Sequence, residues 1–150
     1  MERRALGWGA GPEARPALRL LLGLALCACF VALASGCMLV SGERVNEDIS
    51  PEAGNRSASF VSAEGEALHE LRTGAPDAEL RVIVILEAEQ GELRLDLLDD
   101  GEVTLSARSR PDEQVTRSGT AATDSEGVLR YRVAARGARN GGYQILYQRQ

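Results

Sequence analysis

The chain contains one histidine, His69, and histidine is the side chain best suited to act as a general acid or base near neutral pH. Acyl transfer would also need a serine in a fixed position, and the Gly-x-Ser-x-Gly sequence typical of such serines is absent. His69 stands beside Glu70 in a half-apolar segment, where a histidine is usually structural or solvated. We therefore expect no enzymatic activity, with a small hydrolase that uses His69 as the enzymatic alternative.

Carboxylates gather around one predicted turn. Calcium prefers six to eight oxygen ligands, and the residues that could supply some of them here are Asp96, Asp99, Asp100 and Glu102. The same Asp99-Asp100-Gly101 sequence is typical of an ordinary hairpin turn, and it lacks the alternating aspartates of a calcium-binding loop. Zinc would need more than one histidine and a usable thiol. We expect no cofactor, with calcium at these four carboxylates as the alternative.

Tyrosines could stack on sugar rings if they faced solvent. Tyr143 and Tyr147 alternate in phase with Ile145, and Tyr131 lies in a second strand-like segment with its apolar neighbours in the same phase. This phase predicts that the three tyrosines belong to the core. The only tryptophan, Trp8, lies near the N-terminus, so few aromatic residues remain for a carbohydrate site.

A long apolar run, Leu20 to Cys37, follows four arginines, and no residue from Leu20 to Gly42 carries a charge. A positively charged leader, an apolar core and small residues before a break are the parts of a secretory signal peptide. The arginines stay on the cytoplasmic side while the apolar core enters the bilayer.

The end of this run, Ala34-Ser35-Gly36-Cys37, resembles the bacterial lipobox. Ala34 stands where leucine is commonest in that motif, with Leu33 one place earlier. The resemblance implies that residues 1–36 are a lipoprotein signal peptide and that Cys37 becomes a lipidated N-terminus. Two or three acyl chains would then anchor the protein stably, since each buried methylene contributes about 0.8 kcal/mol.

Two alternatives to lipidation remain: an uncleaved membrane-spanning helix, or cleavage that releases a free secreted protein. Cys27, Cys29 and Cys37 all lie in or at the end of the apolar run, and no cysteine follows. Lipidation is favoured because it removes the unpaired thiol that an exported domain would otherwise carry. We expect a lipid-anchored protein that faces outside the cytoplasm. Met38, which follows the cysteine, permits an outer-membrane location.

Acidic residues dominate beyond residue 36, with 20 acidic residues against 13 arginines and no lysine. This balance argues against nucleic acid as a partner, because phosphate binding needs a basic surface. Residues 43–102 are mainly acidic, and residues 103–150 are mainly basic. We expect the two halves to form ion pairs across strands, with an acidic face for cations or a basic partner as the alternative.

Polar residues and turn formers fill the stretch after the cysteine, so we predict a lipidated N-terminus and flexible tether at residues 37–56 and a folded domain at residues 57–150. Alternating apolar residues in that domain predict short strands, and the clearest lie at 79–89, 93–97, 103–108, 128–135 and 143–147. Residues 115–123 form a weaker candidate at an edge.

Five glycine-containing sequences predict turns in the domain: Glu64-Gly65, Gln90-Gly91, Asp99-Asp100-Gly101, Asp124-Ser125-Glu126-Gly127 and Asn140-Gly141-Gly142. In particular, residues 79–89 and 93–97 are expected to pair as a hairpin. Six or seven short strands at this spacing predict an all-β fold, either a small antiparallel β-sandwich of jelly-roll type or a small barrel.

The closing segment, from Asp124-Ser125-Glu126-Gly127 to Gly142-Tyr143-Gln144-Ile145, resembles small secreted β-sandwiches of the pre-peptidase C-terminal type. That resemblance implies an accessory or binding module. The sequence thus predicts a membrane-anchored, non-enzymatic binding or structural module of the cell envelope. Its partners would be the membrane, through a lipid on Cys37, and an envelope protein or a polysaccharide. A calcium-assisted or carbohydrate-binding accessory module is the alternative.

Overall fold

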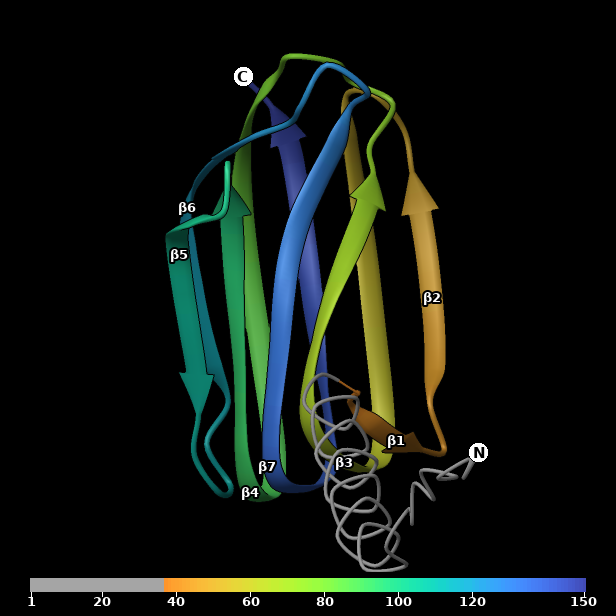
Figure 1. The fold of residues 1–150 in the computed structure, drawn as a ribbon, viewed down its shortest axis with the longest axis vertical. Coiled ribbons are helices and arrows are strands. Elements are labelled where there is room, and N and C mark those ends of the chain that lie inside the picture. Colours follow the sequence, from red (N-terminus) through yellow and green to blue (C-terminus); the bar gives the residue numbers. More distant parts are fainter. Residues whose placement is uncertain (1–36) are drawn as a thin grey trace, which may run out of the picture. The chain divides into compact units, whose positions relative to one another are not determined.

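The computed structural model describes residues 37–150, and their regular structure is antiparallel β-strand (Figure 1). The strands are β1 (Leu39–Ser41), β2 (Arg44–Ile49), β3 (Ala53–Arg72), β4 (Glu79–Asp99), β5 (Glu102–Ser109), β6 (Val115–Ala122) and β7 (Val128–Arg149). The predicted signal peptide, residues 1–36, lies outside the described residues. From residue 37 onward, no helix is long and apolar enough to cross a membrane.

Three long strands build both layers of the fold. β3, β4 and β7 contain 20, 21 and 22 residues, and each bends near its middle and continues in the opposite layer. In Figure 1, β4 runs along one layer, turns at the lower end and returns along the other. Its first half pairs with β6 and its second half with β5. The predicted all-β antiparallel sandwich is confirmed, and a single folded sheet forms it.

The hairpin predicted at Gln90-Gly91 is wrong. The residues on either side belong to one strand, and both halves of that strand pair with β7, where Leu86 faces Tyr143 and Leu93 faces Ala135. The predicted turns at Glu64-Gly65 and at Asn140-Gly141-Gly142 likewise lie inside β3 and β7. By contrast, Asp100 and Gly101 do form the predicted tight hairpin between β4 and β5.

A register shift at each bend keeps the apolar side chains inside. On β4 the buried positions are even-numbered before the bend, as at Val84 and Leu86, and odd-numbered after it, as at Leu93 and Leu95. Without the irregularity between Gln90 and Glu92, all side chains of one half would turn to the wrong face.

β7 is the central strand of both layers. The first layer has the order β2, β3, β7, β4, β6, and it uses the first halves of β3 and β4 with the second half of β7. The second layer has the order β3, β7, β4, β5. β1 pairs with Ser62–Glu64 of β3, at the bend.

The predicted tether at residues 37–56 is also wrong. β1, β2 and the start of β3 fill this stretch, and β2 pairs along its whole length with residues Gly54–Ser59 of β3. All six side chains of β2 are exposed. Backbone hydrogen bonds to the edge of the sheet therefore position this strand, which is why its side chains show no apolar pattern.

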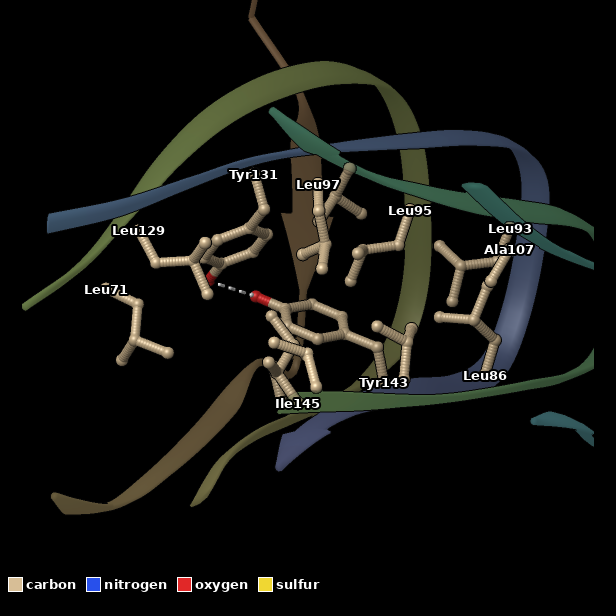
Figure 2. Packing of buried hydrophobic residues seen from close by; sticks show 14 of the residues in the cluster. Leu71, Leu86, Leu93, Leu95, Leu97, Ala107, Leu129, Tyr131, Tyr143 and Ile145 are labelled. Atoms are coloured by element: carbon tan, nitrogen blue, oxygen red, sulfur yellow. Dashed lines mark hydrogen bonds between the residues drawn. The ribbon is translucent and has the colours of Figure 1, made fainter. Parts of the chain in front are cut away.

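The two layers enclose an apolar core, part of which Figure 2 shows. The tyrosines belong to it as predicted: Tyr131, Tyr143 and Tyr147 are all buried. The hydroxyl groups of Tyr131 and Tyr143 lie 3.2 Å apart and point toward each other between the layers (Figure 2). This hydrogen bond satisfies two buried polar groups that would otherwise destabilise the core.

Ion pairs cross the outer face of the second layer. Arg132 contacts Asp96 at 2.9 Å and Glu66 at 3.7 Å, and Arg130 contacts Glu70 at 3.6 Å. These pairs join acidic residues of the first half of the chain to arginines of the second half. The predicted cross-strand pairing of the two halves is confirmed.

A substitution at Gly91 tests whether the close approach of neighbouring bends limits the stability of the domain. Its φ is +74°, and a Cβ there would overlap the backbone carbonyl of Gly137 on the neighbouring bend. We expect Gly91→Ala to lower the free energy of unfolding by several kcal/mol, because positive φ alone costs about 1–2 kcal/mol and the overlap adds to it. Urea denaturation followed by circular dichroism would measure the change.

Gly101→Ala is the matched control. Gly101 also has positive φ (+85°), but no atom lies within 4 Å of an added Cβ. Its replacement by alanine should lower the free energy of unfolding by about 1–2 kcal/mol, which is the cost of placing a side chain on a residue with positive φ. Equal losses in the two variants would show that the close approach of the bends does not limit stability.

Candidate functional site

Cys37 is exposed, and its position is defined by the bend of β3. A Cβ on Gly65 would lie 2.8 Å from the carbonyl oxygen of Cys37, so glycine allows this close approach. Met38 and Val40 pack against the core. The residue predicted to carry the lipid thus lies directly at the end of the sandwich where the long strands bend.

His69 lies between the layers, in a polar cluster at the sandwich edge. Its ring stacks on Tyr131, with centroids 5.1 Å apart and an interplanar angle of 16°. The guanidinium of Arg56 lies 5.8 Å from the Tyr131 ring and forms an ion pair with Glu47 of β2. Among residues 37–150, the ring of His69 contacts Tyr131, and the charges that act on its imidazole belong to Arg56 and Glu43.

Partial burial and the nearby charge of Arg56 lower the pKa of His69, and Glu43 opposes part of this effect. A neutral imidazole is therefore favoured in the folded protein. The cluster has the character of a structural contact that holds β2 and both halves of β3 against Tyr131.

Within residues 37–150, the four carboxylates considered for calcium are not gathered around one point. Asp96 is 1% exposed, and its carboxylate accepts hydrogen bonds from Ser106 at 2.6 Å, Arg94 at 2.9 Å and Arg132 at 2.9 Å. Burial raises the pKa of Asp96, but these three donors outweigh that effect and lower it overall. Asp99, Asp100 and Glu102 are at the β4–β5 hairpin. In the described part of the chain, no group of three potential metal ligands lies together.

The outer face of the first layer has a different composition. We call it the groove face and define it by the outward side chains of β2, β3, β7, β4 and β6. Cross-strand pairing arranges them in rows: Asn46, Ser57, Gln144, Ile85 and Thr116 in one, and Asp48, Asn55, Leu146, Ile83 and Ser118 in the next. Beyond the second row, Gln148, Arg81 and Thr120 form a third.

Three hollows open along this face. One of about 300 Å³ lies over Ser57, Gln144 and Ile85, and one of about 460 Å³ lies over Asn55, Ile83 and Leu146. A third, of about 530 Å³, shares Arg81 and Gln148 with the second. The hollows therefore follow one another from row to row across the sheet.

Amides and hydroxyls form the neutral centre of this groove. Gln144 donates a hydrogen bond to the side-chain oxygen of Asn55 at 3.0 Å, and both amides retain further donor and acceptor capacity. Ile83 is 39% exposed, although its strand, β4, lies in the interior of the sheet between β7 and β6. A surface of this kind can hydrogen-bond a polar ligand while the aliphatic side chains contact its less polar parts.

Sequence reasoning did not identify the groove face. Two signals were present: the apolar residues on both faces of residues 79–89, and the alternation of Gln144, Leu146 and Gln148. In the structure Ile83, one of the residues in the first pattern, is exposed. The second could not be interpreted without knowing that β7 lies between β3 and β4.

No family model matches this chain, and no curated protein matches it. Similar solved structures include the CBM22-1 xylan-binding domain of Paenibacillus barcinonensis Xyn10C, with a TM-score of 0.41, 7% identity, and coverage of 75% of this chain and 85% of that one. TmCBM61 in complex with beta-1,4-galactotriose has a TM-score of 0.39, 16% identity, and coverage of 74% and 90%.

The CBM22-1–GH10 modules of Clostridium thermocellum Xyn10B have a TM-score of 0.41 and 12% identity, and the match covers 75% of this chain and 26% of that one. Likenesses of this size assign neither a family nor a ligand to the chain.

Acidification should destabilise the domain through His69. Its lowered pKa means that the unfolded chain binds a proton at a higher pH than the folded protein does. Stability should therefore fall as the pH decreases from about 7 through the ordinary histidine value of about 6.5 toward the lower folded value. Urea denaturation at pH 7.5, 6.5 and 5.5 would measure the slope.

His69→Phe keeps a ring on Tyr131 but cannot bind a proton, and the chain has no other histidine. The loss of stability between pH 7.5 and 5.5 should be smaller in this variant. An unchanged slope would show that another group causes the pH dependence.

Proposed function

We propose that this chain is an exported lipoprotein whose β-sandwich is a non-enzymatic binding module for a polysaccharide of the cell envelope. The leader and the Ala34-Ser35-Gly36-Cys37 sequence support the anchor. The exposure of Cys37 supports it further, since a lipid must extend from the protein surface. The groove face is the observation that carries the binding role.

The two outer faces of the sandwich differ in how their polar groups are used. On the second layer, arginines and carboxylates form ion pairs with one another, as at Arg132 and Asp96. On the groove face, neutral amides and hydroxyls lie on the central strands, and charged side chains also line the three hollows: Arg44 and Glu87 in the first, Asp48 and Arg81 in the second, and Arg81 and Arg149 in the third. A row of hollows suits an elongated ligand.

Hydroxyl-rich polymers match the chemistry of this groove. Amide and hydroxyl side chains can both donate and accept hydrogen bonds, as sugar hydroxyls can. Ile83, Ile85 and Leu146 offer apolar contact between the polar positions. The aromatic side chains of the described domain, Phe60 and the three tyrosines, belong to the core, so binding rests on hydrogen bonds and aliphatic contact.

The anchor is tested by the intact mass of the protein extracted from its native membrane. We expect a species that begins at Cys37 and is heavier by two or three acyl chains. An unmodified full-length mass would show that the apolar run remains as a membrane span. A species that begins at Cys37 without added lipid would show a free secreted protein.

The groove is tested by affinity electrophoresis in gels that contain dextran, hydroxyethylcellulose or xylan. Gln144→Ala and Asn55→Ala should each weaken retention about five- to tenfold, because a net hydrogen bond contributes about 1 kcal/mol. Leu68→Ala, an exposed position on the second layer, is the control and should bind like the parent protein. Equal retention of all three variants would exclude the groove face. No retention by any polymer would count against this ligand class.

A further inference from the structure

One end of the sandwich holds Cys37 and the three bends. We call it the bend end, defined by Gly65, Gly91 and Gly137 together with β1. Figure 1 shows β1 beside the bend of β3, at the same end of the layers as the bends of β7 and β4, while the β4–β5 hairpin lies toward the opposite end. A lipid on Cys37 would therefore emerge at the bend end.

The path from Cys37 to the fold is very short. β1 begins at Leu39, so Met38 alone separates the cysteine from the first strand. Met38 also packs against the core, and the carbonyl of Cys37 lies against Gly65. Because one extended residue spans only about 3.5 Å, no slack chain remains to hold the domain away from a membrane.

Exposed apolar side chains lie near the same point. Leu39 is 73% exposed and Val61 is 58% exposed, which are high values for aliphatic residues. Leu39 pairs with Glu64 in β1–β3, and Val61 lies directly against Gly42, the residue that follows β1. Apolar side chains in such a position can enter the boundary between lipid headgroups and acyl chains.

The charged side chains at the bend end do not favour an anionic bilayer over a neutral one. Arg136 and Arg139 flank the bend of β7, but Glu64 and Glu89 lie beside them and accept hydrogen bonds from Gly137 and Asn140. Contact with lipid would depend on the apolar residues and the acyl chains.

We propose that the bend end rests on the bilayer surface, with Leu39 and Val61 inserted at the level of the lipid headgroups. This inference rests on the lipid proposed for Cys37. It fixes the orientation of the module: the strands run away from the membrane, and the groove face stands at the side of the domain, open to a polymer along the membrane.

Single tryptophan variants test this orientation. The chain's only tryptophan, Trp8, precedes Cys37, so the introduced residue would be the single tryptophan of the mature protein and can be excited selectively, at wavelengths that tyrosine does not absorb. Leu39→Trp and Val61→Trp place the reporter at the bend end. Val103→Trp is the matched control, because Val103 is also exposed (44%) but adjoins the β4–β5 hairpin. Each lipidated protein is reconstituted into phosphatidylcholine vesicles with or without brominated acyl chains.

We expect brominated lipid to quench Leu39→Trp and Val61→Trp at least twofold, with a blue-shifted emission, and to leave Val103→Trp unchanged. Equal behaviour of all three variants, with acyl chains present in the intact mass, would overturn the orientation and leave the lipoprotein assignment standing. A mass without acyl chains would overturn both. Circular dichroism would confirm that each variant is folded.

Discussion

The whole structure depends on three neighbouring strands that change layers at the same level. β7 remains hydrogen-bonded to both β3 and β4 on both sides of the bends, so a single sheet supplies both layers. The bend of β4 brings Gly91 so close to the backbone of Gly137 that a side chain would not fit. The shift in register at that point keeps the leucines and valines of both halves in the core.

The surfaces follow from this arrangement. Each layer has one face in the core and one in solvent, and the polar residues of the two solvent faces differ. The charged side chains of the second layer pair with one another. At Asp96 the carboxylate accepts hydrogen bonds from Ser106, Arg94 and Arg132. The groove face has a neutral centre, with Gln144 and Asn55 between partly exposed aliphatic residues. One face is thus a structural surface, and the other has unused hydrogen-bonding capacity.

Local sequence patterns predicted the features that depend on residues close together in the chain. Alternation identified the strands and placed Tyr131, Tyr143 and Tyr147 in the core, and Asp100-Gly101 marked a true hairpin. The sequence around Gly91 predicted a hairpin in the same way, but Gly91 forms a bend at which β4 crosses from one layer to the other. The chain on both sides of Gly91 pairs with β7, about 50 residues away, and not with itself. The local sequence does not show this distant pairing. β2 was missed because its pairing is carried by backbone groups.

The candidate site was predicted less well, since it depends on which strands are neighbours. The carboxylates proposed for calcium could be counted in the sequence, but the arginine that neutralises Asp96 from β7 could not be assigned to it. The rows of the groove face combine residues from five strands. The lipid on Cys37 remains a prediction from the leader.

The position of β7 also determines when the domain can fold. The last of the seven strands in chain order is the central strand of both layers, and its pairs include residues as distant as Ala53 and Gln148. Until β7 has been made, β3 and β4 have no neighbour in common, and the core between the two layers lacks its central strand. Such non-local pairing makes folding slow. A chain that lacks β7 therefore lacks the strand that joins β3 to β4 in both layers, and we expect the sandwich to become compact only once β7 is present.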